Sequence, residues 1–374
     1  MAGRVTEILK KAVDGVRVDD EEALILMREG DLLELGQAAN LIRNRLNDPK
    51  VVTYIVDRNI NYTNVCVYRC KFCAFYRRPG DPEGYLLSRE ELRQKIQETV
   101  DLGGTGVLLQ GGVHPDLPFE YYLDLLSWMR EEFPDVHRHA FSPPEILFMA
   151  RITKKPLREI IEKLIEAGLQ SIPGGGAEIL VDKIRLETLA YPKASSKGWL
   201  DVMRHAHELG LRTTATMMFG QGESYEDRIE HLQKVRALQD QTRGFTAFIA
   251  WTFQNENTEM QHIEEASKFE YLRMQSIGRI YMDNIRATQS SWVTQGLAIG
   301  QLALKFGAND MGSIMIEENV VAAAGARNKV TTEEMKQLIR DAGYEPVQRL
   351  TLYQGFVDEE THERVAREAG AIAR

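Results

Sequence analysis

The first 48 residues carry a hydrophobic pattern typical of amphipathic helices. Apolar residues such as Ile8, Val13 and Leu26 sit among Glu, Lys and Arg. From residue 49 onward, short β-rich runs alternate with amphipathic helical segments. We therefore expect a helical extension over residues 1–48, followed by an α/β domain over residues 49–374 that ends in a helical cap.

The alternating region contains eight candidate strands. They are Val51–Val56, Gly106–Gln110, Val136–Phe141, Leu169–Ile172, Arg212–Met218, Phe245–Trp251, Asn284–Thr288 and Lys305–Ala308. Alternating β and α units predict a parallel sheet with right-handed crossovers. Eight units favour closure into a (β/α)8 TIM-type barrel, although an open doubly wound sheet gives the same pattern. In a barrel, functional side chains gather at the C-terminal ends of the strands.

Three of the intervening segments begin with a capping box, in which a Ser or Thr precedes an acidic residue by three positions. These boxes are Ser88–Glu91, Ser224–Asp227 and Thr331–Glu334, and each leads into a run of apolar residues at helical spacing. Gly103 and Gly343 supply stop signals for the first and third of these helices.

Composition narrows the possible partners. The 374 residues are 43% hydrophobic and 27% charged, with a formal net charge of −9 and no stripe of Lys or Arg. Nucleic-acid binding depends largely on neutralising phosphates, so we expect no nucleic-acid partner. The apolar runs are too short to cross a bilayer, and the N-terminus has no apolar signal segment. We therefore expect a cytoplasmic protein whose thiols stay reduced.

All three cysteines lie in one segment, Cys66-Val-Tyr-Arg-Cys70-Lys-Phe-Cys73, with the spacing C-x3-C-x2-C. Clustered thiolates in a reduced compartment indicate a metal site. Structural zinc takes four protein ligands, and the nearest downstream histidine is His114. Three thiolates suit a [4Fe–4S] cluster that keeps one iron open for a small chelating ligand. A zinc site, an electron-transfer or thiol redox centre, and unliganded structural cysteines remain alternatives.

Other motifs follow predicted strands. Gln110-Gly111-Gly112 would allow close backbone approach to a ligand, and a plain tight turn explains it at least as well. The triple glycine at residues 174–176 suits an anion cradle at a helix N-terminus, and a flexible βα loop explains it equally well. His137 and His139 share one strand face, where structural roles are favoured over a metal pair because no third ligand is near.

The cysteine loop, with Phe72 before its last cysteine, resembles the signature of the radical S-adenosylmethionine (SAM) superfamily. The resemblance implies a [4Fe–4S] cluster on Cys66, Cys70 and Cys73 that reduces SAM, producing a 5′-deoxyadenosyl radical. It also implies SAM contacts from Phe72, Gln110, Gly111, Gly112, Ser142, Glu178, Arg185 and Met218. Glu178 would bind the ribose hydroxyls, and Arg185 the SAM carboxylate.

Four further stretches, at residues 54–64, 73–79, 290–296 and 309–320, narrow the resemblance. They are similar to the group that contains cyclic dehypoxanthine futalosine synthase, aminofutalosine synthase and the two deazaflavin (FO) synthase modules, most of all to the first. That likeness implies a step of the futalosine route to menaquinone. Hydrogen would be abstracted from C4′ of the substrate ribose, the carbon radical would add to the aromatic ring, and loss of one electron and one proton would follow.

The resemblance also sets expectations for the substrate side. A cation, from Arg58, Arg77 or Arg78, would suit the substrate benzoate, and Asn61, Asn64 and Asn319 would suit its ribose hydroxyls. The predicted substrate contacts are Arg58, Asn61, Asn64, Arg77, Ser290, Asn309, Asp310 and Asn319. Candidates for the final proton acceptor are Glu145, Asp310 and His139. We also expect an external one-electron reductant such as flavodoxin or ferredoxin.

Three alternative functions remain, two of them enzymatic. Aminofutalosine synthase or the FO synthase module that joins a tyrosine-derived fragment to a diaminouracil would share the barrel and most motifs. A non-enzymatic iron–sulfur electron carrier is the alternative outside catalysis, and it is disfavoured because carriers expose their cluster.

Overall fold

The computed structural model describes residues 2–188 and 194–357. The strands are β1 (Val51–Ile55), β2 (Asp57–Ile60), β3 (Gly106–Leu109), β4 (His137–Ala140), β5 (Ser171–Ile172), β6 (Arg212–Phe219), β7 (Phe245–Thr252), β8 (Ala287–Gln289), β9 (Asp310–Ser313) and β10 (Glu345–Gln348). The helices are α1 (Ala2–Val13), α2 (Asp20–Glu29), α3 (Leu32–Leu46), α4 (Arg89–Asp101), α5 (Phe119–Glu132), α6 (Pro143–Thr153), α7 (Leu157–Ala167), α8 (Asp182–Thr188), α9 (Ser196–Glu208), α10 (Tyr225–Thr242), α11 (Lys268–Tyr281), α12 (Trp292–Gln295), α13 (Leu297–Leu302), α14 (Val320–Ala323) and α15 (Thr332–Asp341), with a 3-10 turn at Ala303–Lys305.

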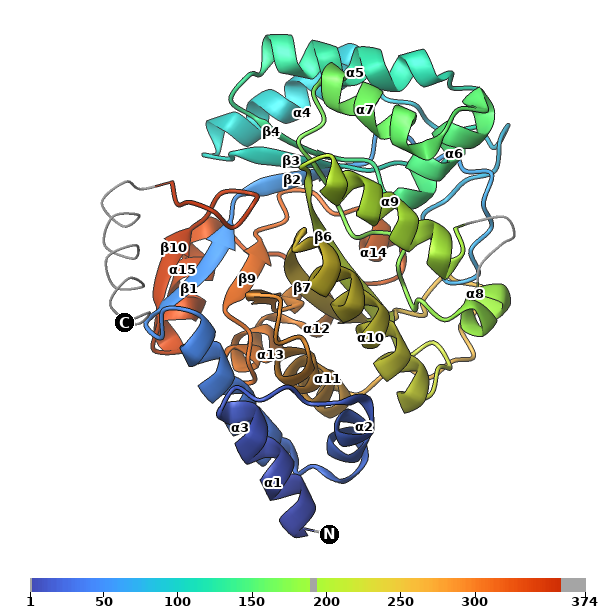
Figure 1. The fold of residues 1–374 in the computed structure, drawn as a ribbon. Helices are drawn as coiled ribbons and strands as arrows, with labels where there is room; N and C mark the ends of the chain where they lie inside the picture. Colours follow the sequence, from blue (N-terminus) through green and yellow to red (C-terminus); the bar gives the residue numbers. More distant parts are fainter. Residues whose placement is uncertain (1, 189–193, 358–374) are drawn as a thin grey trace.

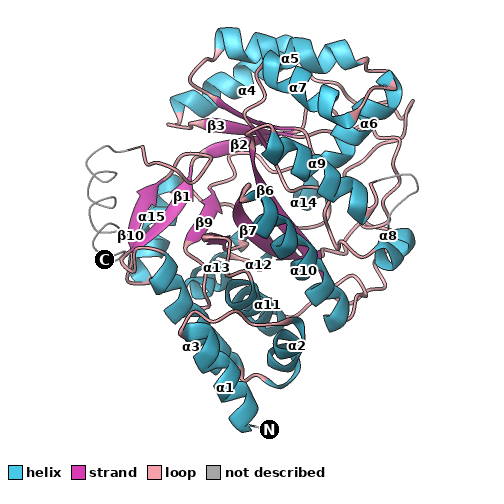
Figure 2. Cartoon of the chain, in the orientation of Figure 1, coloured by secondary structure: helices cyan, strands magenta, loops and turns pink. Residues whose placement is uncertain are grey.

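All these strands belong to one parallel sheet, in the order β10-β1-β9-β8-β7-β6-β5-β4-β3-β2. β1 and β2 are consecutive, separated only by Val56, yet β1 pairs with β9 and β2 pairs with β3. The row of strands therefore returns on itself, and helices cover its outer side (Figures 1 and 2). The predicted parallel α/β barrel is confirmed as a curled sheet of this kind.

The last described strand, β10, was not predicted from the sequence. It pairs with Val51–Tyr54 of β1, whereas β3 pairs farther along the same chain segment, with Asp57–Ile60 of β2. β10 therefore covers the N-terminal part of the barrel wall. The residues that follow it, including Arg349, Thr351 and Tyr353, reach the barrel interior.

Several predicted strand boundaries need correction. The prediction of a strand at Lys305–Ala308 is wrong, because Ala303–Lys305 forms a 3-10 turn and the strand follows at Asp310–Ser313. β8 begins at Ala287 rather than Asn284, whose side-chain amide donates to the carbonyl of Arg236 at 2.9 Å. The predicted Leu169–Ile172 strand is limited to Ser171–Ile172.

The predicted helix starts are confirmed. Ser88, Ser224 and Thr331 each cap a helix through reciprocal bonds with the acidic residue three positions on. Helices also occupy the N-terminal segment as expected, where α3 packs on α11 and α2 on α10. The part of the predicted C-terminal cap beyond residue 357 lies outside the described residues. Within the described residues, no helix has the length and apolarity needed to cross a membrane.

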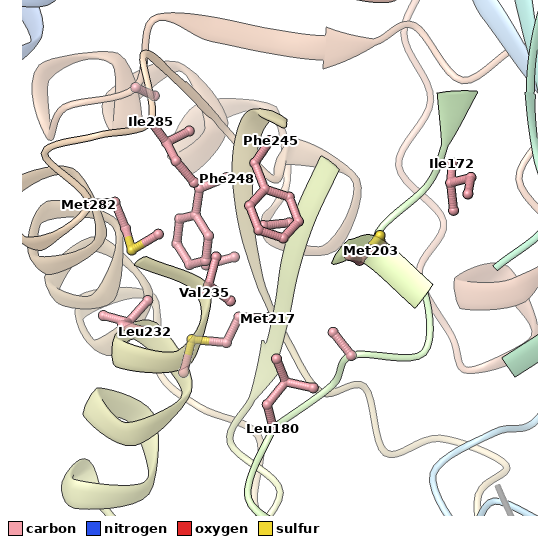
Figure 3. Close-up of a cluster of buried hydrophobic side chains, with 14 of the residues drawn as sticks. Ile172, Leu180, Met203, Met217, Leu232, Val235, Phe245, Phe248, Met282 and Ile285 are labelled. Atoms are coloured by element: carbon pink, nitrogen blue, oxygen red, sulfur yellow. The ribbon is translucent and has the colours of Figure 1, made fainter. Parts of the chain in front are cut away.

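The hydrophobic core lies between the sheet and the helices that surround it. Figure 3 shows Phe248 of β7 beside Val235 of α10 and Met282, which follows α11. All three side chains are fully buried. Burying such side chains stabilises the fold by about 1.5–3 kcal/mol each, so this layer fixes the strands that carry the interior side chains.

Candidate functional site

A cavity of about 430 Å³ opens inside the barrel and along its C-terminal rim. It is lined by all three cysteines and by seven of the eight residues predicted to contact SAM. Those seven are Phe72, Gln110, Gly111, Gly112, Ser142, Glu178 and Met218. The described structure thus brings together, in one cavity, motifs that are separated by up to 152 positions in the chain, from Cys66 to Met218.

The cysteine loop follows β2 and is held by backbone hydrogen bonds at several points. Cys66 N donates to the carbonyl of Arg77 at 2.9 Å, and Val67 N donates to the carbonyl of Val113 at 2.9 Å. The Arg77 guanidinium donates to the carbonyls of residues 74, 75 and 76, and Nε donates to Glu83 at 2.7 Å. Arg77 thus holds the loop and does not line the cavity, so its position does not support the predicted substrate contact.

The glycines at the end of β3 allow this loop to approach. A Cβ on Gly112 would overlap the carbonyl of Val65, and a Cβ on Gly111 would overlap the ring of Tyr62. The lack of side chains at these glycines therefore lets another segment of the same chain, residues 62–65, pack closely against them. As a result the wall formed by Gln110–Gly112 lies directly against the segment that carries the cysteines.

Glu145 ties this wall to the start of α6. Its carboxylate accepts from Tyr62 Oη at 2.6 Å, Gly111 N at 3.2 Å, Ser142 N at 2.7 Å and Ser142 Oγ at 2.6 Å. Burial raises the pKa of Glu145. Because four donors already occupy its oxygens, Glu145 has the geometry of a positioning group rather than of the predicted proton acceptor.

Arg185 holds the loop that carries the triple glycine. It donates to the carbonyls of Gly176 at 3.0 Å, Ala177 at 2.5 Å, Ile179 at 3.2 Å and Ala194 at 2.9 Å. Its Nη1 lies 3.7 Å from the Glu178 carboxylate, and Glu178 itself adopts a left-handed φ of 42°. Arg185 does not line the cavity, so it positions the Glu178 loop and its location does not support direct contact with SAM.

A second row of side chains comes from β1 and β2, next to the wall formed at the end of β3. Ile55, Asp57, Asn59 and Asn61 line the cavity, as expected for alternate residues of one strand. Arg58 points to the other face, where it is paired with Glu98 at 2.8 Å and Glu317 at 3.2 Å. The predicted substrate contact of Asn61 is therefore supported by its position, and that of Arg58 is not.

Most of the other predicted substrate contacts lie outside the cavity. Asn64 binds the backbone of Glu83 and Tyr85, and Asn309 accepts from Arg279 at 2.7 Å. Asn319 does not line the cavity, but it donates a hydrogen bond at 3.2 Å to Oδ1 of Asn61, which does. Ser290 does line the cavity. Asp310 does not, because it is fully buried in an ion pair with Arg349 at 2.5 Å.

Several lining residues were not predicted from the sequence. They are Asp57, Asn59, Gln289, Glu318, Arg349 and Tyr353. Among the lining residues of the described chain, Arg349 is the one Lys or Arg side chain. Strand alternation could have identified Asp57 and Asn59 once Asn61 was chosen. Nothing local marked Arg349, because β10 brings it in from the far end of the chain.

The two histidines of β4 share one partner. His137 Nε2 and His139 Nδ1 lie 2.7 and 2.6 Å from Ser171 Oγ. Burial lowers the pKa of His137 to about 4 and that of His139 to about 3, so both are neutral near pH 7. Within residues 2–188 and 194–357, no three His, Cys, Asp or Glu side chains are grouped as ligands of a single metal ion.

The donor set fits the cofactors that the sequence suggests. Cys66, Cys70 and Cys73 are soft thiolate donors on one loop, and all three face one cavity. In the same cavity, the Gly111 and Gly112 carbonyls and the Ser142 hydroxyl oxygen are acceptors suited to an amino group, and Glu178 is suited to ribose hydroxyls. Phe72 and Met218 add apolar surface of the kind that an adenine ring packs against.

Two family models match parts of this chain. Residues 60–235 match the radical SAM superfamily model, and residues 242–362 match the model of the CofH/MqnC C-terminal region. This chain therefore belongs to the radical SAM superfamily, whose members carry a [4Fe–4S] cluster and use SAM. Within that superfamily it belongs to the CofH/MqnC family.

Near-full-length relatives refine the position. The cyclic dehypoxanthine futalosine synthase of Halalkalibacterium halodurans is 46% identical over 96% of this chain and 97% of its own length. The enzyme of that name from Streptomyces coelicolor is 45% identical, over 94% and 88%. The 5-amino-6-(D-ribitylamino)uracil–L-tyrosine 4-hydroxyphenyl transferase of Methanopyrus kandleri is 37% identical, over 92% and 99%.

A solved structure supports the fold independently. Methylornithine synthase superposes with a TM-score of 0.70, covering 96% of this chain and 99% of its own. The two sequences are only 20% identical, so this likeness concerns the fold alone.

Proposed function

We propose that this protein cyclises dehypoxanthine futalosine to cyclic dehypoxanthine futalosine, a step of menaquinone biosynthesis. The observation that carries the proposal is the 45–46% identity, over nearly the whole chain, to two relatives that bear this name. The transferase relative from the same family is less similar, at 37%. The site is consistent with the proposal, because the cysteines and seven of the eight predicted SAM contacts line a cavity that also has a polar row on β2.

The cofactors and the chain have separate tasks in this proposal. The cluster and SAM, when bound, supply reductive cleavage of a carbon–sulfur bond and hydrogen-atom abstraction. The cysteine loop would hold the cluster, and Glu178 and the Gly111–Gly112 wall would orient SAM. The polar row Asp57–Asn59–Asn61 faces the remaining space, where the substrate would lie. Holding the two reactants in one geometry is the main contribution that the barrel makes to rate.

The net reaction removes two hydrogens from the substrate. One leaves C4′ of the ribose as a hydrogen atom, a carbon–carbon bond forms to the aromatic ring, and one proton and one electron leave from the ring. The buried, largely apolar cavity protects the carbon radical from solvent and from competing hydrogen donors. An external one-electron donor, such as flavodoxin or ferredoxin, and a cytoplasmic location complete the proposal.

The experiment is a substrate competition under anaerobic conditions. The reconstituted protein receives a reductant, SAM and either dehypoxanthine futalosine or the pair of tyrosine and diaminouracil substrate. We expect 5′-deoxyadenosine and a product two hydrogens lighter than dehypoxanthine futalosine. Turnover of only the tyrosine pair would overturn the substrate assignment, and no nucleoside with either set would overturn the reaction class.

A matched variant controls for chemistry outside the site. Cys70→Ala removes one thiolate from the loop and leaves the other residues that line the cavity unchanged. The variant should form neither 5′-deoxyadenosine nor cyclised product. Equal turnover by Cys70→Ala would show that the measured reaction does not depend on the cysteine loop.

A further inference from the structure

The row of side chains on β1 and β2 ends in a carboxylate deep in the barrel. Asp57 and Asn61 lie on the same strand face, four residues apart, and both line the cavity. At about 3.3 Å per residue, Asp57 lies roughly 13 Å from Asn61 along the strand, toward its N-terminal end. Ser313 of β9 donates a hydrogen bond to Asp57 Oδ1. No hydrogen bond reaches Oδ2 from any of residues 2–188 or 194–357.

The other carboxylates that line the cavity are already committed. Glu145 accepts four hydrogen bonds, two on each oxygen. Glu318 accepts from Val320 N and Val321 N on Oε1 and from Asn59 Nδ2 on Oε2. Glu178 lies beside Arg185 on the loop that the family resemblance assigns to the SAM ribose. Among the described residues, Asp57 is therefore the lining carboxylate with an acceptor atom left open toward the substrate side.

Histidine offers a weaker alternative in the same cavity. Burial lowers the pKa of His139 to about 3, and its Nδ1 is engaged with Ser171 Oγ at 2.6 Å. A base with so low a pKa has little affinity for a proton at neutral pH. Asp310, the third predicted acceptor, is enclosed by Arg349, Thr53 and Gly312 N and does not line the cavity.

The surroundings of Asp57 leave it able to gain and lose a proton. The carboxylates of Asp57 and Asp310 both face the guanidinium of Arg349. This guanidinium binds both oxygens of Asp310, at 2.5 and 3.1 Å. Ser313 on β9 and Tyr353 on the C-terminal segment complete the groups that act on this pair. Burial and the nearby Asp310 charge raise the pKa of Asp57 to about 6, against the lowering effects of Ser313 and Arg349.

We infer that Asp57 is the base that takes the ring proton after ring closure, an inference that rests on the proposed cyclisation. In this step the C–H bond at the newly bonded ring carbon breaks, and an O–H bond forms at Asp57 Oδ2. The two electrons of that C–H bond and the unpaired ring electron make three. Two of them restore the aromatic π bond, and one passes to an acceptor of the iron–sulfur class.

The test separates hydrogen abstraction from product formation. Wild type should form 5′-deoxyadenosine and cyclised product in equal amounts. In Asp57→Asn, 5′-deoxyadenosine should still form in the presence of substrate, while product falls by about 10²-fold, the usual contribution of a general base. Asp57→Glu keeps a carboxylate, so it should form at least tenfold more product than Asp57→Asn. A product-to-nucleoside ratio near one in Asp57→Asn would overturn the inference. So would an equal loss of 5′-deoxyadenosine and of cyclised product in both Asp57→Asn and Asp57→Glu.

The pH dependence supplies a second readout. The base is protonated below its pKa, so wild-type product formation should rise with pH through about 6. In Asp57→Glu, the midpoint of that rise should shift, whereas an unshifted midpoint would contradict the assignment to residue 57. Asp310→Asn changes the same network without removing the base, because Asp310 does not line the cavity. Its lost charge should move the midpoint to lower pH, since that charge raises the pKa of Asp57. This variant should lower stability and keep the product-to-nucleoside ratio near one.

The outcomes distinguish this inference from the proposed function. If wild type does not convert dehypoxanthine futalosine, the proposed function fails before Asp57 is tested. If wild type converts it and Asp57→Asn does so at the same ratio and pH profile, only the inference about Asp57 fails.

Discussion

Arg349 and Asp310 form a two-point ion pair at the base of the barrel interior. Nε of Arg349 donates to Oδ2 of Asp310 at 2.5 Å, and Nη2 donates to Oδ1 at 3.1 Å. Arg349 follows β10 and Asp310 begins β9, so the pair joins the C-terminal segment to the wall that faces the substrate side. The ring of Tyr353 packs 3.6 Å from the same guanidinium. The described C-terminal segment is thus part of the cavity.

Removing one partner of this pair should be costly. Asp310→Ala leaves the Arg349 charge buried without its carboxylate, and we expect a loss of about 3–5 kcal/mol in the free energy of unfolding. Urea denaturation midpoints would measure it. Arg158→Ala is the control, because its pair with Glu162 is exposed and should contribute at most about 1 kcal/mol. Equal midpoints in the two variants would contradict the role given to the buried pair.

Gly112 should be required for the cysteine loop. Its substitution by Ala places a Cβ against the carbonyl of Val65, and the relief of that overlap must move the segment next to Cys66. We expect Gly112→Ala to bind less iron and sulfide per chain after reconstitution. Gly3→Ala on α1 is a suitable control, since a Cβ added at Gly3 would meet no atom within 4 Å. Full cluster content in Gly112→Ala would refute the packing argument.

Arg185 should affect SAM binding without touching SAM. Lys in its place keeps the charge but cannot reproduce the planar set of donors that binds four carbonyls around the Glu178 loop. We expect Arg185→Lys to weaken SAM binding about tenfold, with iron content unchanged. Equilibrium binding of SAM to the reconstituted protein is the measurement. Wild-type affinity in this variant would show that the loop does not depend on Arg185.

Buried histidines should make the fold sensitive to acid. Burial lowers the pKa of His207 and of His231 to about 3, as it does for His139. The unfolded chain binds these protons below about pH 6.5 and the folded chain does not, so stability falls as pH drops from 6.5 toward 3. Each histidine contributes about 1.4 kcal/mol per pH unit in that window.

The variant His207→Gln isolates this effect from the carboxylates, which also titrate. The loss of unfolding free energy between pH 7 and pH 5 should be smaller in the variant by roughly 2 kcal/mol. An unchanged pH dependence would mean that His207 is protonated in the folded state.

The features that depend on residues close together in the chain were predicted correctly from the sequence. Side-chain capping at Ser88, Ser224 and Thr331 depends on residues three apart, so the helix starts were predicted correctly. The cysteine spacing likewise lies within one loop. The Asp310–Ser313 strand was missed because it contains no β-branched residue, and its pairing with β1 is set by long-range contacts.

The substrate wall was harder to predict, for two physical reasons. Arg58 and Asn61 were both chosen as substrate contacts, although residues separated by an odd number of positions on one strand face opposite sides. Only Asn61 lines the cavity, with Asp57 and Asn59 in the same row. Arg349 enters the interior because β10 pairs beside β1, and no pattern near residue 349 signals that pairing.

The most direct measurement follows one hydrogen atom. Dehypoxanthine futalosine carrying deuterium at C4′ of its ribose is incubated anaerobically with the reconstituted protein, SAM and reductant. We predict one deuterium in the recovered 5′-deoxyadenosine and none at C4′ of the cyclised product. Unlabelled 5′-deoxyadenosine, with deuterium retained in the nucleoside substrate, would contradict the account.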